Sequence, residues 1–502
     1  MTKGIKRIFI IIFVVLFMVT GCKSPEVLQI QQDTLITQDL NGVDLKKLNQ
    51  YTIDVVFNPD KATIQVNQMT DYINTEDVSL RELYFHLYPN SYRKMETAPF
   101  LFDAFEEAYP EGFQPGYIDI SQLTVNGKAA EYVLEGEGST IMKIVLDNPL
   151  KSGERSKITM EYTVKLPPSQ ERFGYGADTF NFGNWYPVAA VYDETGWNLD
   201  PYYPIGDPFY SDVSNYMVTI DTPKDYTVAA SGNIFKDEIK DDRRTCEIET
   251  KLMRDFAWVA GKNFKIVEKE VEGTVLKMYF IQDEYLKQDV IDFATGVGEN
   301  SLKVFNRVFG KYPYGQYSVV QTNFPSGMEY PGIVFIGKQF YDTVWQDYLE
   351  IVIVHETAHQ WWYGIVGNDE IDEAWLDESL AAYSEVVYIV EEYGEEQGRE
   401  YHRFANTDQY NEAIVSIYNK TVLKPLYEFE SWEDYGPLVY SKGAVFLNEL
   451  RETYGKDKFY QIMSNYYNEN RFKNATSQDF QKVTEEVTGE NLDPLFNKWL
   501  LE

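Results

Sequence analysis

The sequence predicts an α+β protein with more than one domain, in which an all-β amino-terminal domain precedes an α+β domain with mostly carboxyl-terminal helices. Between residues 51 and 264, short runs alternate apolar and polar side chains, which is the period of strands with one buried face. From residue 348 onward, the apolar residues recur at helical spacing. With 502 residues, the chain is long enough for two or three domains.

The predicted strands are rich in β-branched and aromatic residues and are separated by Gly, Pro, Asn and Asp. We expect the β domain to cover residues 49–270 and the second domain to cover residues 271–502. The clearest strands are predicted at residues 51–57, 62–66, 83–88, 157–164 and 216–220, and then at 275–281, 317–321 and 332–336. Helices are predicted at residues 348–363, 374–392, 443–454, 457–467 and 477–487.

The charge balance argues against two classes of direct partner. The chain has 45 Lys and Arg against 79 Asp and Glu, a formal charge of −34 that is spread along its length. Nucleic acids and anionic lipid surfaces bind to basic patches, so neither is expected as a direct partner. Cationic peptides suit this charge, although the solubility of an exported protein explains it equally well.

The first 22 residues have the pattern of a secretory signal. Lys3, Lys6 and Arg7 precede an apolar run over residues 8–19, which is short for a membrane-spanning helix. The run ends in Val-Thr-Gly-Cys. This ending resembles a bacterial lipobox, in which cleavage leaves a lipidated amino-terminal cysteine, here Cys22. An uncleaved anchor and an ordinary signal peptide are the alternatives.

Lipidation of Cys22 would anchor the protein to the outer face of the bacterial cytoplasmic membrane. Residues 23–48 are polar with little periodicity, and we interpret them as a spacer. The second cysteine of the sequence, Cys246, would then have no partner for an intrachain disulfide. Stability must therefore come from packing and from any bound metal.

Two of the four histidines lie four residues apart in the run His355-Glu356-Thr357-Ala358-His359. Positions i and i+4 of a helix share one face, so both imidazoles can point at one ion. Glu356 is rotated about 100° from His355 around the helix. It therefore stands beside the ion without binding it, as a general base that activates water does.

Glu378 is the candidate third ligand. It lies 19 residues beyond His359, at the start of the next helical pattern, and the turn at residues 364–369 lets the chain double back. Two His and one Glu with an open fourth position form a hydrolytic zinc site, so one Zn²⁺ per chain is expected. Two core histidines beside a solvated Glu378 are the structural alternative, which burial without a metal would make costly.

These motifs resemble those of the aminopeptidase N family of zinc metallopeptidases, the gluzincins. The resemblance rests on HETAHQWW at residues 355–362, WLDES at residues 375–379, and MRDFAWVAG at residues 253–261. It implies a saddle-like β domain and a thermolysin-like catalytic domain. It also implies a zinc-dependent aminopeptidase whose substrates are peptides with a free amino terminus, here a short member that lacks the family's carboxyl-terminal helical domain.

The resemblance also assigns roles to single residues. The run Ser326-Gly327-Met328-Glu329-Tyr330 is similar to the family's Gly-Ala-Met-Glu-Asn strand. This implies that Gly327 and Met328 lie along the substrate and that Glu329 binds its α-amine.

Tyr440, in a Tyr-x-Lys-Gly context, resembles the tyrosine that stabilises the oxyanion, with Tyr435 as the other choice.

Several positions depart from the family pattern. Tyr330 replaces an Asn and Ser379 replaces a Gly, and the usual Phe-Pro-Cys-x-Asp-Glu-Pro run of the β domain is missing. The family's second amine-binding residue comes from that domain, and neither Asn181 nor Asn184 can be assigned this role. Two other functions stay open: an extracellular zinc endopeptidase, and a catalytically silent surface binding protein.

Replacing Cys22 by Ala tests the lipobox. We expect the native chain to incorporate labelled palmitate and Cys22→Ala to incorporate none, because the thioether-forming thiol is gone. The measurement is metabolic labelling followed by membrane fractionation, with Cys246→Ala as the control that keeps its label. Label that persists in Cys22→Ala would contradict the prediction.

Overall fold

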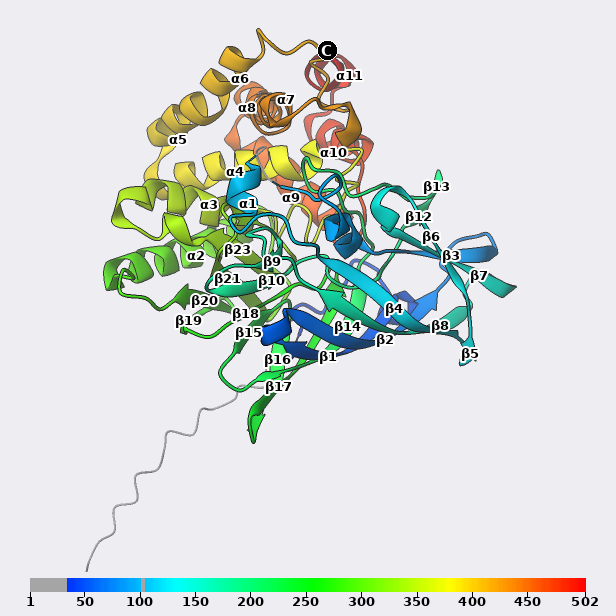
Figure 1. Ribbon diagram of the computed structural model, residues 1–502. Helices are drawn as coiled ribbons and strands as arrows, with labels where there is room; N and C mark the ends of the chain where they lie inside the picture. The colour runs from blue at the N-terminus through cyan, green and yellow to red at the C-terminus, as the bar shows by residue number, and fades with distance from the viewer. Residues whose placement is uncertain (1–33, 101–103) are drawn as a thin grey trace, which may run out of the picture. The chain divides into compact units, whose positions relative to one another are not determined.

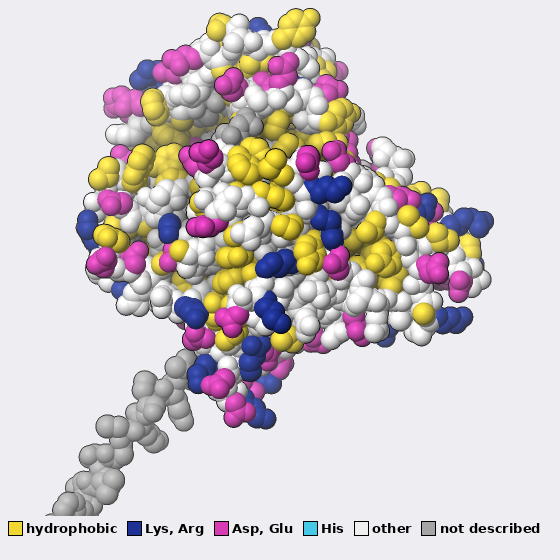
Figure 2. Space-filling view, viewed as in Figure 1, with side chains coloured by type: hydrophobic (Ala, Val, Ile, Leu, Met, Phe, Trp, Pro, Cys, Tyr) yellow, Lys and Arg dark blue, Asp and Glu magenta, His cyan; other side chains and the backbone are white. Residues whose placement is uncertain are grey.

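The computed structural model describes residues 34–100 and 104–502 (Figure 1). The predicted signal segment, including Cys22, lies outside these residues. Within the described ranges, no helix combines the length and the apolar character needed to cross a bilayer. Asp and Glu side chains are scattered over the face shown in Figure 2, interspersed with Lys and Arg.

An eight-stranded sheet is the largest part of the β domain. Strand β1 pairs in parallel with β14 and antiparallel with β2. Along β2, buried and more exposed residues alternate as the sequence predicts. In sheet order the strands are β16 (Asn233–Lys240), β17 (Arg243–Met253), β14 (Ser214–Pro223), β1 (Gln50–Asn58), β2 (Thr63–Ile73), β8 (Arg155–Lys165), β4 (Tyr117–Val125) and β5 (Lys128–Ala129).

Two four-stranded sheets and a two-stranded sheet of β12 (Tyr192–Asp193) and β13 (Gly196–Trp197) complete this domain. The first consists of β15 (Thr227–Ala230), β18 (Trp258–Gly261), β10 (Thr179–Phe182) and β9 (Phe173–Tyr175). The second consists of β11 (Val188–Ala189), β3 (Leu80–His86), β7 (Ile141–Leu150) and β6 (Tyr132–Glu135). The core between sheets is aromatic: Phe182 stacks on Trp258 with ring centroids 3.6 Å apart, and Phe57 meets Trp258 edge-on. Such pairs add directional contacts to the burial of apolar area.

A five-stranded sheet opens the second domain. Its order is β19 (Phe264–Val271), β20 (Thr274–Ile281), β21 (Gln316–Thr322), β23 (Ile333–Gly337) and β22 (Gly327–Met328). The expected boundary near residue 270 is therefore too late, because β19 pairs with β20 and not with the β domain. Strand β22 is the last in the order and pairs antiparallel with β23, and its other edge pairs with no strand of the described residues.

Helices make up most of the remaining second domain. The long predicted helices are present, and α3 packs against both α2 and α4. Helix α2 was not predicted, although its buried residues recur at helical spacing. The helices are α2 (Gln288–Val308), α3 (Gln346–Ala358), α4 (Trp375–Tyr393), α5 (Glu395–His402), α6 (Asp408–Ala413), α7 (Trp432–Tyr435), α8 (Gly443–Tyr454), α9 (Lys456–Asn470), α10 (Ser477–Thr488) and α11 (Asp493–Phe496). In the β domain, α1 (Phe105–Ala108) is a single turn.

The segment from residue 34 to residue 48 does not behave as a spacer. Leu35 forms a β-bridge with Tyr314, and Asp39 forms an ion pair with Arg471. The side chain of Asn41 donates to the carbonyls of Glu469 and Arg471. These contacts satisfy backbone and charged groups of the segment, so the sequence interpretation of residues 23–48 is corrected for this part.

Arg254 joins the two domains. Its side chain is 1% exposed and donates to the carbonyls of Tyr363 at 2.9 Å and Lys473 at 3.0 Å. It also donates to the carbonyl of Ser211 and to the side chain of Asn474. One guanidinium thus satisfies acceptors from the β domain and from two segments of the helical domain.

Replacing Arg254 by Met should loosen this junction. The change leaves several buried carbonyls without donors, so the free energy of unfolding should fall by about 3–5 kcal/mol. Denaturant unfolding measures the effect. Arg244→Met, which removes a partly exposed ion pair with Asp237, is the matched control and should cost no more than about 1 kcal/mol. Equal losses in both variants would refute the role of Arg254.

Candidate metal centre and active site

Three predicted ligands converge between α3 and α4. The Nε2 atoms of His355 and His359 are 3.1 Å apart, and each lies 3.2 Å from Oε2 of Glu378. Tetrahedral zinc ligands at about 2.0–2.1 Å from the ion are about 3.3–3.4 Å from one another. The triangle therefore fits one zinc ion with little adjustment. These three residues also form one of the groups in the described part whose ligand atoms lie within 4.8 Å of one another.

Each imidazole is oriented by a second contact. Nδ1 of His355 lies 2.7 Å from Oε1 of Glu385, and Nδ1 of His359 lies 3.1 Å from the carbonyl of Trp362. Both partners are acceptors, so the proton sits on Nδ1 and the Nε2 lone pair faces the metal position. Glu385 also accepts from the Tyr401 hydroxyl. The sequence analysis missed Glu385, although it follows Glu378 by two helical turns on the same face.

Close packing fixes α4 against the π-helix η10 (Gly436–Lys442) and the start of α8. A Cβ at Gly443 would lie 1.8 Å from Oγ of Ser379, so only glycine allows this approach. The Ser379 hydroxyl donates to the carbonyl of Val439 at 2.5 Å. Ser379, which stands where the family pattern has Gly, therefore holds the segment that carries Tyr440 by a hydrogen bond.

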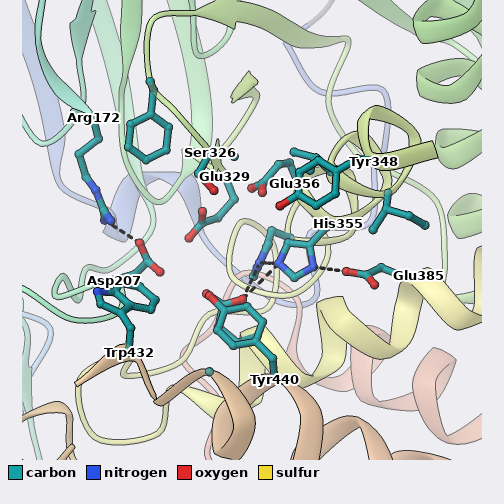
Figure 3. Close-up of a pocket in the computed structure, with 17 residues that line it drawn as sticks. Arg172, Asp207, Ser326, Glu329, Tyr348, His355, Glu356, Glu385, Trp432 and Tyr440 are labelled. Atoms are coloured by element: carbon teal, nitrogen blue, oxygen red, sulfur yellow. Dashed lines mark hydrogen bonds and ion pairs between the residues drawn. The ribbon is translucent and has the colours of Figure 1, made fainter. Parts of the chain in front are cut away.

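The predicted oxyanion residue lies beside the metal position. The Tyr440 hydroxyl donates to Oε1 of Glu378 at 2.5 Å (Figure 3). Burial raises the pKa of this phenol well above its usual value, so the group stays protonated and remains a donor. Tyr435, the other choice, is fully buried and does not line the cavity.

Glu356 lies where a general base is needed. A Cβ at Gly327 would lie 1.8 Å from Oε1 of Glu356, so the glycine lets the carboxyl group approach β22. Among the described residues, Oε2 of Glu356 has no hydrogen-bond partner. Burial, reinforced by Glu378 and opposed by His355, raises the pKa of Glu356 to about 8. A cation bound by the triad would lower the pKa of Glu356 toward neutral pH. A pKa near the working pH suits a group that takes up and releases a proton.

Glu329 and Asp207 face the same cavity (Figure 3). Glu329 is 4% exposed, and its Oε1 has no partner within the described chain. Burial raises the pKa of Glu329 well above its usual value, and the nearby Asp207 and Glu356 add to the effect. Asp207 forms a buried ion pair with Arg172 at 2.6 Å. This end of the cavity is thus set up to receive a cation.

The β-domain contribution is Arg172 with Asp207, and neither was found from the sequence. Asn181 and Asn184 do not line the cavity. Asn181 donates to the carbonyl of Glu171, whereas Asn184 donates to Asp255 and accepts from the Tyr330 hydroxyl at 2.8 Å.

Tyr330, which stands where the family pattern has Asn, therefore links the segment after β22 to the β domain by a hydrogen bond.

The cavity has a volume of about 350 Å³ and lies between the two domains' contributions. Gly327 lines it, and so do His355, Glu356, His359 and Glu378. Met328, also predicted to lie along the substrate, is 1% exposed and does not line the cavity. Its contribution is limited to the backbone of β22.

Comparison with known proteins gives further evidence on the family of this chain. Residues 293–499 match the model of the Peptidase family M1 domain. Aminopeptidase M1-B of Oryza sativa subsp. japonica is 23% identical over 405 residues, which are 76% of this chain and 45% of that protein. Aminopeptidase A of Gloydius brevicauda is 30% identical over 152 residues, 30% of this chain and 16% of that protein. The chain thus spans less than half the length of these relatives.

Solved structures agree with the fold. The M1 zinc metallopeptidase from Deinococcus radiodurans superposes with a TM-score of 0.63 at 16% identity, covering 90% of this chain and 94% of that one. A variant of an M1 zinc metallopeptidase from the same organism, bound to a Tyr-Ser-Ala substrate, superposes with a TM-score of 0.62 at 16% identity over the same shares of both chains.

The fold is that of the two-domain M1 zinc metallopeptidase structures, and the His-His-Glu centre has the ligand set of a zinc site. More narrowly, residues 293–499 are a Peptidase family M1 domain, and the resemblance to the aminopeptidase N family is confirmed there.

Zinc should stabilise the folded chain through this triad. Because the ligands converge only in the native state, free zinc at 100 times its Kd should add about 2.7 kcal/mol. Thermal unfolding with zinc and with a chelator measures the difference in Tm. Glu378→Gln should abolish the difference, while Glu449→Gln, which removes an ion pair with Lys498, should keep it. An unchanged response in Glu378→Gln would contradict the assignment.

Proposed function

We propose that the chain is a zinc-dependent aminopeptidase that removes the first residue from peptides. The observation that carries this proposal is the asymmetry of the cavity. Glu329 and Asp207 lie at one end, and His355 of the triad lies beyond them (Figure 3). A terminal ammonium placed on these carboxylates brings the first carbonyl of the peptide to the triad.

Binding starts at Glu329. Its buried carboxylate gains a charge-assisted hydrogen bond from the α-amine, which an internal amide cannot supply. Asp207, whose charge is offset by its ion pair with Arg172, offers a further carboxylate acceptor on the same side. The free edge of β22 can pair with the substrate backbone through main-chain hydrogen bonds. Together these contacts fix the first residue and its carbonyl in one orientation.

The bound zinc would polarise the carbonyl and make the attacking water more acidic. Glu356 takes the proton from that water and then delivers it to the leaving amine. The Tyr440 phenol is protonated and lies next to Glu378, and its single O–H turns from that carboxylate to donate to the developing oxyanion. His355 and His359 keep their orientation through Glu385 and the Trp362 carbonyl.

The two alternatives are less well supported. An endopeptidase must pass substrate chain beyond the amine end, but Glu329 and the Arg172–Asp207 pair occupy that end of the cavity. A silent binding protein has no use for Glu356, whose carboxyl group is buried beside the triad. Lipid anchoring through Cys22 on the outer face of the membrane belongs to the proposal and is supported by the sequence pattern.

Aminoacyl-arylamides, tested beside the same compounds with an N-acetyl group, measure the reaction. We expect the native chain to cleave only the free-amine set and to lose activity with a zinc chelator. Glu329→Gln should lower kcat/KM about 10- to 100-fold, since one charge-assisted contact is lost. Glu356→Gln should lower kcat about 10²- to 10⁴-fold. Cleavage of acetylated compounds would instead favour the endopeptidase.

A further inference from the structure

An exposed apolar surface borders the cavity on the side away from Glu329. It consists of Val344, Trp345 and Tyr348, which are 82%, 53% and 49% exposed. The Tyr348 ring packs against Phe340 at 4.7 Å and meets the Trp345 ring edge-on at 6.4 Å. We call these three residues the shelf. Large apolar side chains held in fixed contact at a cavity edge are typical of binding surfaces.

The shelf is continuous with the catalytic cavity. Tyr348 belongs to the shelf and also lines the cavity, as do Ile351, Val352 and His355 farther along α3. These positions recur at helical spacing and share one face of α3. In Figure 3, Tyr348 lies on the opposite side of His355 from Arg172 and Asp207. An apolar path therefore leads from the triad to the shelf.

Strand β22 gives the direction of this path. The strand runs toward Glu329 at one end, and at the other end the carbonyl of Pro325 accepts a hydrogen bond from the Gln339 side chain at 2.5 Å. Gln339 precedes Phe340, on which Tyr348 packs. A peptide whose amine is held at Glu329 and whose backbone follows β22 thus extends toward the shelf.

Helix geometry indicates which substrate residues arrive there. Tyr348 precedes His355 by seven residues, and a rise of about 1.5 Å per residue separates them by about 10 Å along the axis. Trp345 lies about one turn farther. An extended peptide advances about 3.3 Å per residue, so the shelf is level with about the third to the fifth residue of a substrate cleaved after its first.

We propose that the shelf binds apolar or aromatic side chains at the third to fifth positions of the substrate. This inference rests on the proposed function and names its substrate class: peptides of at least four residues with an apolar downstream side chain. A side chain covering Trp345 and Tyr348 removes apolar surface of both partners from water and gains edge or stacked ring contacts. This contact stabilises the bound substrate and the transition state equally, so we expect it to lower KM and to leave kcat unchanged.

A peptide series measures this preference. The first residue is the one whose arylamide is cleaved best; Ala fills the other positions of a pentapeptide, and Phe is placed in turn at positions three, four and five. We expect Phe at one or more of these positions to raise kcat/KM about tenfold over the all-Ala peptide, mainly by lowering KM. The quantity compared among variants is the ratio of kcat/KM for the best Phe peptide to that for the arylamide.

Trp345→Ala should lower this ratio about tenfold. Phe235→Ala, at an exposed position on β16, is the matched control and should leave the ratio as in the native chain. A flat peptide series, or equal ratios in both variants, would overturn the shelf while arylamide cleavage upheld the aminopeptidase. Absence of arylamide cleavage in the native chain would defeat the proposed function, and the shelf proposal with it.

Discussion

Five carboxyl groups line one small cavity, and the guanidinium of Arg172 is the one permanently charged cation among the residues that line it. Buried negative charges repel one another and lose hydration, so each is costly without a positive partner. A divalent ion at the triad and an ammonium at Glu329 would offset most of this negative charge. The scaffold must hold the carboxylates in place against this repulsion.

The surrounding packing shows how that is done. Helices α3 and α4 contact each other directly, and Gly327 and Gly443 let a strand and a helix approach the site where a side chain would collide. An acceptor at each Nδ1 fixes the orientation of both imidazole rings, so that each Nε2 points at the metal position. The triad is therefore preorganised, and a metal that binds there reorganises little of the protein.

Local periodicity made much of the site predictable. The spacing of His355, Glu356 and His359 fixes their relative directions on any helix, and Glu378 follows at the start of the next helix. Glu329 and Tyr440 needed the family resemblance, because a single acid or phenol carries no signal of its own. The β domain's strands were evident from alternation, but the domain boundary was placed too late because β19 has the same period as the strands before it.

Other features depend on contacts between distant segments. Arg172 and Asp207 reach the cavity from the β domain, and nothing in their neighbouring sequence marks them. Asn184, to which the sequence assigned no role, accepts a hydrogen bond from Tyr330. The polar segment at residues 34–48 gave no periodic signal, although its backbone and charges find partners near residues 314 and 471. Tertiary contact, which short-range pattern does not encode, decides these cases.

The division of the cavity between two domains has a mechanistic consequence. Glu329 lies next to Tyr330, which bonds to Asn184 of the β domain, and Asp207 comes from that domain as well. The triad and the shelf side belong to the helical domain. A small shift at the domain junction would therefore move the amine-binding carboxylates relative to the metal position. Such a shift would change where the carbonyl of the first substrate residue lies relative to the metal. Arg254, which spans that junction, thus bears on specificity as well as on stability.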